Sequence, residues 1–403
     1  MAEELSSRSE ELKKWITQIV SEIGPRWAGS PAEARAAERI RKEFGKTCDE
    51  AEIDAFSAYP RFPENSPHII LGFYILALVL YPTSRWLAFG IFAFGGAWHL
   101  LDNIFMLKFL DPIISVKRTV TNVIGKIHPS EETKKILILS AHHDSPNCYR
   151  IWDDDFKGKK YLRLMLITEV IVYSFLFFTL AGSIAGSFFE IYVYNGITYV
   201  DILWIPFAFA AIYILWYCKL FTPYAPGSGA NDNLAAVAAL IGVGRSLARK
   251  RPRYTQIWLV SFGAEERGFK GSLHFAKKYK KLLKEALIVN LDLVGAGRKS
   301  VIHTHEKFYG AKLSPEAVDF ALKAAKRAGI DAIPYVAPAG GSDAAALCYH
   351  GLKATTIFNH AEDKWPPMWH NDTDRPENID PGALENMIRL LEETVRESED
   401  QSG

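Results

Sequence analysis

Two long blocks of apolar residues interrupt this chain, and they constrain its fold more than any other feature. The first block runs from residue 68 to residue 107 and breaks at the turn PTSR; the second runs from about 164 to 221 and breaks at EIYVYNGIT. A helix needs about 20 mostly apolar residues to cross the hydrocarbon core of a membrane. Residues 170–189 and 202–218 contain no charged side chain. The sequence therefore predicts transmembrane helical hairpins at 67–108 and 163–221, rather than pairs of buried core helices.

The hairpin pattern also predicts where the polar remainder of the chain lies. Because each block is a hairpin, the chain returns to the side of the membrane that it left. We therefore expect residues 1–66, 109–162 and 222–403 to form one discontinuous domain in one compartment. Lysine and arginine cluster in the segments that flank the hairpins on this side, whereas the far-side turns hold only Arg85. By the positive-inside rule, the chain is expected to be an integral, multi-pass membrane protein with its polar domain in the cytoplasm.

The polar segments predict an α/β fold. Four apolar runs, ILILS, IWLVSF, LIVNLDL and ATTIFN, alternate with helical patterns such as NLAAVAALIGVGRSLARK. Near-continuous apolar strands that alternate with helices are typical of a mixed, largely parallel sheet with helices on both faces. Upstream, residues 1–20 and 32–45 read as surface helices, and Ser30 followed by Pro31 suits a helix start. Without the two hairpins, roughly 300 residues remain, which suits one large domain.

Composition excludes two classes of protein. The 47 basic and 46 acidic residues nearly balance, so we expect no nucleic-acid partner, which would require a basic surplus on one face. The four cysteines are widely spaced and form no CxxC pair, which argues against a disulfide framework and a structural zinc knuckle. Cys148 lies six residues after His142, but it has no neighbouring cysteine with which it could share a metal.

Candidate functional side chains follow the predicted strands or precede the predicted helices. His142 ends the run ILILSAH, Asp232 lies in GANDN before an amphipathic helix, and Asp292 lies in LIVNLDLVG. In open α/β sheets, ligands gather at such strand ends. Capping of the helix is the structural alternative for Asp232. A buried carboxylate such as Asp292 is costly unless it is paired or bound to a metal, so its position favours a functional role.

Two adjacent glutamates follow the second apolar run in GAEERG. Successive side chains diverge, so Glu265 and Glu266 are not expected to bind the same metal together. One ligand and one general base is the simplest division of roles. We assign Glu265 as the base and Glu266 as the ligand. A solvated acidic turn is the structural alternative for an isolated pair of glutamates.

Two histidines of this chain are the preferred candidates for metal ligands. His142 is preferred to His143 because Asp144 could accept the second N–H of its ring and fix the tautomer. His370 in WHNDTD is the second candidate ligand, with Asp374 four residues later as its expected partner. His360 in FNHAED is the rival to His370. The residues His303 and His305 look like parts of a strand edge.

The resulting set predicts a two-metal centre. Imidazole and carboxylate ligands together suit Zn²⁺ or a similar divalent ion. A carboxylate shared by two metals about 3.5–4 Å apart would help hold the attacking water. The predicted metal ligands of two Zn²⁺ ions per chain are His142, Asp232, Glu266, Asp292 and His370, and the predicted catalytic residues are Glu265 and Asp144.

The order H-x-D, G-A-x-D, E-E, D and H-x-x-x-D resembles the two-zinc exopeptidase family of bacterial leucyl aminopeptidase, yeast aminopeptidase Y and glutamate carboxypeptidase II. GPRWAGSPAEARAAERI and TNVIGKI also resemble segments of that family. The resemblance covers most of the polar sequence and none of the apolar hairpins. It implies that His142 and Asp292 bind one metal and that Glu266 and His370 bind the other. It further implies that Asp232 bridges the metals while Glu265 activates the water.

The chain departs from the family pattern in two places. Ser342-Asp343-Ala344 stands where the family often has S-D-H, and Ala235-Ala236 stand where many members have S-G. Neither departure removes a ligand, but the first bears on the choice of substrate.

These observations predict a membrane-anchored zinc exopeptidase, an aminopeptidase that removes N-terminal residues of peptides. Glutaminyl cyclisation and carboxypeptidase action on the same site are the enzymatic alternatives. A non-catalytic membrane interaction module is the third. The expected partners are a peptide substrate, the lipid bilayer and, through small residues at 181–187 in the second hairpin, another copy of the chain.

Overall fold

The computed structural model describes residues 2–60, 66–103, 109–153, 192–194, 197–361 and 365–401, together with Val170, Ser174, Phe177 and Ala181. The chain divides into two compact units. Unit 1 comprises residues 1–61, 110–148 and 225–403, and unit 2 comprises residues 62–109 and 149–224.

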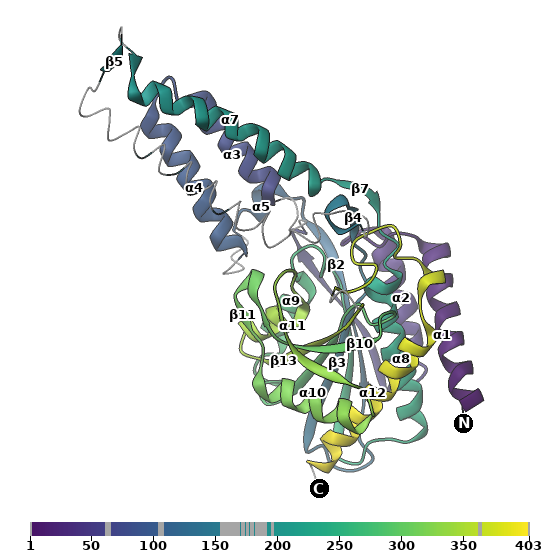
Figure 1. The fold of residues 1–403 in the computed structure, drawn as a ribbon. Helices are drawn as coiled ribbons and strands as arrows, with labels where there is room; N and C mark the ends of the chain where they lie inside the picture. Colours follow the sequence, from purple (N-terminus) through teal and green to yellow (C-terminus); the bar gives the residue numbers. More distant parts are fainter. Residues whose placement is uncertain are drawn as a thin grey trace. The chain divides into compact units, whose positions relative to one another are not determined.

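A nine-stranded mixed sheet forms the centre of unit 1 (Figure 1). Its strands, in spatial order, are β1 (Glu50–Ala58), β2 (Arg118–Ile127), β8 (Thr255–Phe262), β3 (Lys135–His142), β9 (Leu287–Leu291), β13 (Lys353–His360), β10 (Lys299–Glu306) and β11 (Ala311–Lys312), with β12 (Ala332–Ala337) paired to β10. The four central strands β8, β3, β9 and β13 are parallel. These are the four strands that the apolar runs predicted, and the predicted mixed, largely parallel sheet is confirmed.

Helices cover both faces of this sheet. One face packs against α1 (Ala2–Ile23), α2 (Pro31–Phe44), α8 (Ala235–Arg249), α10 (Pro315–Arg327) and α12 (Pro381–Asp400). On the other face lie α9 (Lys270–Tyr279) and α11 (Asp343–Tyr349), which contact each other. The alternation along β8 shows the two faces: Ile257 and Leu259 join the large apolar cluster, whereas the ring of Trp258 lies 6.3 Å from that of Phe275 in α9. The short helix α5 (Asp111–Ile114) completes the unit.

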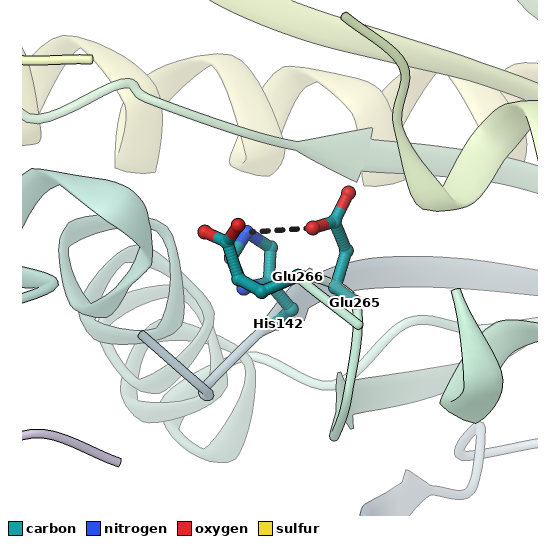
Figure 2. A group of neighbouring side chains, drawn as sticks. All are labelled: His142, Glu265 and Glu266. Carbon is teal, nitrogen blue, oxygen red and sulfur yellow. Dashed lines mark ion pairs between the residues drawn. The ribbon is translucent and has the colours of Figure 1, made fainter. Parts of the chain in front are cut away.

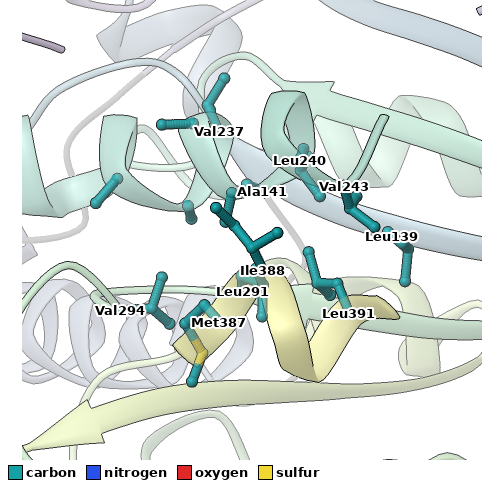
Figure 3. Packing of buried hydrophobic residues seen from close by; sticks show 14 of the residues in the cluster. Leu139, Ala141, Val237, Leu240, Val243, Leu291, Val294, Met387, Ile388 and Leu391 are labelled. Carbon is teal, nitrogen blue, oxygen red and sulfur yellow. The ribbon is translucent and has the colours of Figure 1, made fainter. Parts of the chain in front are cut away.

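Helix α8 is the most deeply buried helix of the described chain, and its small residues allow this. From Ala235 to Gly244 every residue is buried. A Cβ added at Gly242 would lie 2.7 Å from Cδ1 of Ile388 and 3.1 Å from Cδ1 of Leu12, so α12 and α1 pack closely against this position. Figure 3 shows Ile388 and its neighbours from α12 among side chains of α8 and the central strands.

The N-terminal segment follows its sequence signals. Ser30 accepts a hydrogen bond from the backbone N–H of Glu33 at 3.1 Å, and Pro31 is the first residue of α2. Proline suits this position because its missing N–H would have no partner within the helix. The start of α2 therefore lies where the sequence predicts it.

Unit 2 contains the helices α3 (Ser66–Leu80), α4 (Arg85–Asn103) and α7 (Tyr199–Leu220). These three pack around a shared apolar cluster that includes Tyr74, Phe92 and Ile214. The unit also holds the short strands β5 (Tyr192–Tyr194) and β6 (Ile197–Thr198). Two further short strands, β4 (Asn147–Tyr149) and β7 (Pro223–Pro226), pair with each other.

The transmembrane helices predicted at 67–108 and 163–221 require a correction. Among the residues that the structure describes, no helix has both the length and the apolar character needed to cross a membrane. In the first hairpin, α3 has only 15 residues, fewer than the 20 or so that a span needs. The last turns of α4 contain His99, Asp102 and Asn103. The predicted stretch 170–189 lies largely outside the described residues.

Candidate metal centre

Parallel strands bring the candidate residues to one edge of the sheet. His142 is the last residue of β3, and Asp292 directly follows β9 rather than lying inside it. Glu265 and Glu266 lie in the turn between β8 and α9, and His370 lies in the loop after β13. Since β8, β3, β9 and β13 are adjacent and parallel, their carboxyl ends share this edge. Asp232 reaches it from the irregular turn Ala230–Leu234, just before α8.

Asp232 lies between the two histidines and directs one oxygen toward each. Its Oδ1 is 3.3 Å from Nε2 of His142, and its Oδ2 is 3.4 Å from Nε2 of His370. Nε2 of His142 is also 3.6 Å from Oδ1 of Asp292. Nε2 of His370 is 3.3 Å from Oε2 of Glu266. The five predicted ligands thus form two sets of three that share Asp232. A third possible set joins His142 to both Glu265 and Glu266, which the sequence analysis did not expect to bind one metal together.

The donor atoms of this cluster fit divalent metal ions. All five residues are at most 8% exposed, and three of them are carboxylates. Buried carboxylates need a compensating positive charge. Oε1 of Glu266 has no hydrogen-bond partner among the residues that the structure describes. Two sets of imidazole and carboxylate donors, with a carboxylate oxygen still unsatisfied, suit zinc.

Burial perturbs the acid–base properties of these groups. It raises the pKa of Glu266 to about 8 and that of Asp292 to about 6. Burial also acts to lower the pKa of His142, but the carboxylates around the ring outweigh it and raise this pKa well above its usual value. For Asp232, burial is outweighed by the two histidines, so its pKa falls below the usual value. The cluster therefore retains protons unless another cation replaces them.

Glu265 differs from Glu266 in its surroundings, although both come from the same turn. Oε2 of Glu265 lies 3.9 Å from Nε2 of His142, which is the ion pair drawn in Figure 2. Burial raises the pKa of Glu265 well above its usual value. The histidine beside it opposes that shift. A carboxyl group with a raised pKa beside the two sets that share Asp232 suits a group that takes up and releases a proton.

Asp144 connects the two strands that carry these residues. Its Oδ1 accepts the backbone N–H of Glu265 at 3.0 Å, and its Oδ2 accepts that of Glu266 at 3.2 Å. Oδ1 also lies 3.5 Å from Nδ1 of His142. The predicted contact between Asp144 and His142 is thus an ion pair that is longer than the hydrogen bonds Asp144 accepts from the two glutamates. The short hydrogen bonds of Asp144 instead hold the glutamate turn.

Two asparagines that the sequence reasoning did not single out flank Asp232 and hold the segments on either side. Asn233 donates to the carbonyl of Leu291 at 2.9 Å and accepts the backbone N–H of Leu293 at 3.3 Å, so it brackets Asp292. Asn231 donates to the carbonyl of Pro367 at 3.0 Å and accepts the N–H of Gly295 at 2.7 Å. The motif GANDN contained both residues, but spacing alone did not distinguish them from turn formers.

Asp374 supports the same turn. Its Oδ1 accepts the backbone N–H of Asn231 at 2.6 Å, and Ser228 donates its hydroxyl to the carbonyl of Asp374. Burial raises the pKa of Asp374 to about 7. The structure thus places this residue on the Asp232 turn, whereas the sequence suggested a contact with His370.

The rival residues lie outside the donor sets. The three candidate metal-binding groups among the described residues contain none of Cys148, His303, His305 and His360. The ring of His360 packs edge-on against Tyr335, with centroids 4.8 Å apart. His303 stacks on Phe358 at 4.5 Å, and its Nδ1 lies 3.1 Å from Oε1 of Glu306.

The segment Ser342-Asp343-Ala344, which departs from the family pattern S-D-H, is buried. Ser342 donates its backbone N–H and its hydroxyl to Glu306. Burial raises the pKa of Asp343 to about 7, and neighbouring carboxylates add to the shift.

A family model and a known aminopeptidase each match part of this chain. Residues 217–395 match the model of peptidase family M28. That segment contains Asp232, Glu265, Glu266, Asp292 and His370 but not His142. Aminopeptidase YwaD of Bacillus subtilis (strain 168) is 27% identical over 180 residues, which are 44% of this chain and 38% of that protein. The chain thus matches well under two thirds of the length of this relative.

Solved structures share the fold over nearly the whole chain. A zinc aminopeptidase from Bacillus subtilis has a TM-score of 0.57 at 16% identity, covering 97% of this chain and 94% of its own. A leucine aminopeptidase precursor from Bacteroides thetaiotaomicron VPI-5482 has a TM-score of 0.55 at 15% identity and covers 96% of both chains. An Acidobacteriales bacterium glutaminyl cyclase has a TM-score of 0.56 at 16% identity, covering 98% of this chain and 96% of its own.

Less than half of the chain thus matches peptidase family M28, and the solved structures show that the chain shares the fold of these aminopeptidases and of the glutaminyl cyclase. The expected resemblance is confirmed for residues 217–395 by the family model and for the fold by the solved structures.

Proposed function

We propose that the chain is a two-metal zinc exopeptidase that removes N-terminal residues from peptides. The observation that carries this proposal is the position of Asp232, whose two carboxylate oxygens face two different histidines at 3.3 and 3.4 Å. One carboxylate shared in this way suits a bridging ligand between two metals. His142 and Asp292 would complete one metal site, and His370 and Glu266 the other.

The residues around the proposed metals divide the remaining chemistry. Zinc, when bound, would act as a Lewis acid that polarises the scissile carbonyl. Glu265 would take a proton from the attacking water and deliver it to the leaving amine, a role that its raised pKa favours. Asp144 would hold Glu265 and Glu266 in place through their backbone N–H groups.

The substitution Glu265→Gln tests this division of roles. It keeps the size of the side chain but removes the proton acceptor. We expect hydrolysis of aminoacyl-amide reporters to fall by about 10²–10⁴-fold, while elemental analysis still finds about two zinc ions per chain. Glu266→Gln is the matched variant from the same turn, and it should lose metal as well as activity. Hydrolysis by Glu265→Gln at the wild-type rate would remove this glutamate from the mechanism.

Glutaminyl cyclisation is the second candidate, because solved glutaminyl cyclases share this fold at TM-scores of 0.55 to 0.56. Mass spectrometry of one peptide panel separates the candidates. Loss of the first residue indicates an aminopeptidase, loss of ammonia from peptides that begin with glutamine indicates a cyclase, and loss of the last residue indicates a carboxypeptidase. Purified protein that binds no metal and turns over no peptide would instead favour the non-catalytic interaction module.

We also propose that unit 2 anchors the protein in a lipid bilayer, with unit 1 in the cytoplasm. The apolar composition of residues 67–108 and 163–221 supports this, as do exposed apolar side chains in unit 2. Val79 is 65% exposed, Phe209 65% and Ile212 67%. Apolar surface of this kind is favourable in lipid and costly in water.

Two experiments test the anchoring. The protein should stay with membranes after extraction at alkaline pH, and release into the supernatant would contradict it. A cysteine placed at position 195, in the predicted far-side turn, should be labelled from outside intact cells. Protection at that position would reverse the proposed orientation. Cross-linking of two differently tagged copies tests self-association through the small residues at 181–187.

A further inference from the structure

Arg26 is fully buried, yet its guanidinium group faces backbone carbonyls rather than a hydrogen-bonded carboxylate. Nε donates to the carbonyl of His143 at 2.8 Å. Nη1 donates to that of Ser228 at 2.8 Å, and Nη2 donates to that of Gly229 at 2.9 Å. Its backbone is held as well, because the N–H of Arg26 donates to the hydroxyl of Ser145 at 2.8 Å.

Arg26 also donates from Nη1 to the carbonyl of Gly24 at 3.2 Å, but its three shorter bonds reach two different loops of the candidate metal centre. His143 lies between His142 and Asp144 at the end of β3. Ser228 and Gly229 begin the turn that carries Asp232 into α8. The segment between α1 and α2 therefore joins the two loops that supply His142 and Asp232, whose Nε2 and Oδ1 atoms lie 3.3 Å apart.

The turn at Gly229 is shaped around this guanidinium. Gly229 has a φ of 64°, in the left-handed region that favours glycine, and a Cβ added there would overlap Nη2 of Arg26. The planar fork of an arginine can reach three carbonyls at once in fixed directions, whereas the ammonium of a lysine is a single point. These contacts between the two loops therefore require an arginine at position 26 and a glycine, which has no side chain, at position 229.

We propose that Arg26 is a positioning residue that sets the separation of His142 and Asp232 and thereby the affinity of the first zinc site. This inference rests on the proposed metal centre. Arg26 does not touch the metal or the substrate in this role. It acts through the backbone of the two ligand-bearing loops, and through Asp144 it also reaches the turn of Glu265 and Glu266.

The test compares two substitutions at Arg26 with one at Arg8. Arg8 is a matched control because it also ties distant segments together, donating to Glu392 at 2.7 Å and Ser246 at 2.8 Å between α1, α12 and α8, but it does so away from the site. The full-length variants Arg26→Lys, Arg26→Met and Arg8→Met are stripped of metal. Their unfolding by urea and their zinc affinity, by competition with a chelating dye, are then measured.

Loss of a residue that supports metal ligands typically lowers metal affinity by about 10–100-fold. We expect a decrease of this size in both Arg26 variants, and a lower kcat at saturating zinc with little change in KM. Arg8→Met should lower the urea midpoint and leave zinc affinity unchanged. Partial recovery of zinc affinity by added methylguanidinium in a folded Arg26→Ala variant would further support the proposal.

Two results would overturn the proposal. One is zinc affinity within about twofold of wild type in the folded Arg26→Lys variant, because lysine retains the charge but cannot make the three carbonyl contacts. The other is an increase in affinity in Arg26→Met with no change in Arg26→Lys, because the guanidinium would then act only as a nearby charge. Both results are measured relative to the wild-type chain. If the wild-type chain itself binds no zinc, the proposed metal centre is rejected, which is a different outcome from a change at Arg26.

Discussion

Nε2 of His143 lies 3.1 Å from Oε1 of Glu33, and this contact fixes the histidine that neighbours His142. Nδ1 of His143 lies 2.9 Å from the hydroxyl of Ser261. Both ring nitrogens of His143 therefore have partners inside the protein that are not among the candidate metal ligands. Adjacent residues at the end of a strand point to opposite faces, so the pair His142-His143 serves one structural and one candidate metal-binding role.

Replacement of each histidine should separate these roles. His142→Ala removes a nitrogen donor from the first set, so we expect the zinc content to fall from about two ions per chain to about one. His143→Ala should keep the zinc content and lower the melting temperature, because it leaves Glu33 and Ser261 without this partner. Elemental analysis and thermal unfolding of both variants check the prediction. Zinc loss in His143→Ala alone would show that the two histidines are assigned the wrong way round.

The carboxylate of Glu33 should contribute measurably to stability. It is fully buried, and its Oε1 accepts the backbone N–H of Thr121 at 3.1 Å as well as facing His143. Glu33→Ala strands these buried groups, which costs about 1–3 kcal/mol for each unsatisfied donor. Urea unfolding gives the change in free energy. Arg35→Ala, at an exposed position of the same helix, is the control and should change stability by less than about 0.5 kcal/mol.

Close packing at Gly242 makes this position intolerant of larger residues. Gly242→Val places methyl groups where Ile388 and Leu12 already lie, at 2.7 and 3.1 Å from the first added carbon. Overpacking of a filled core costs about 1–3 kcal/mol. Ala248→Val, at an exposed position of the same helix, controls for the lower helix propensity of valine. Equal destabilisation of the two variants by denaturant would contradict the packing argument.

The metal-free protein should lose stability as the pH rises. The folded-state pKa values of Glu266 and Asp374 are raised to about 8 and about 7, from ordinary values of 4.5 and 3.8. Between the ordinary and the raised values, the folded state therefore holds more protons than the unfolded state. Stability then falls with rising pH across that window. Urea unfolding of chelator-treated protein between pH 5 and pH 8 measures the decrease.

Zinc should reverse this trend, because metal binding favours the deprotonated ligands. The same titration with zinc present is the control, and its stability should be equal or greater at pH 8 than at pH 5. A flat profile in the metal-free protein would show that the buried carboxylates are compensated in another way.

The sequence predicted the parts of the structure that local patterns encode. Apolar runs predicted β3, β8, β9 and β13, and the motifs at their ends predicted the residues that meet at the sheet edge. The partners of the backbone could not be predicted in this way. Arg26, Asn231 and Asn233 act through hydrogen bonds to carbonyls and N–H groups far away in the sequence, and such contacts leave no spacing to read. The bounds of the apolar helices were predicted to within a few residues, as in α7 (Tyr199–Leu220), but among the described residues none of these helices could span a membrane.

The position of β3 in the sheet has a consequence for any attempt to express part of this protein. The strand precedes unit 2 along the chain, yet it lies between β8 and β9, which both follow that unit. A fragment limited to residues 217–395, the part with the family match, would lack the central strand together with His142, Asp144 and Arg26. Its remaining strands would face a gap with unpaired backbone on both sides. The smallest fragment that could fold and form the proposed metal centre therefore includes the chain on both sides of unit 2.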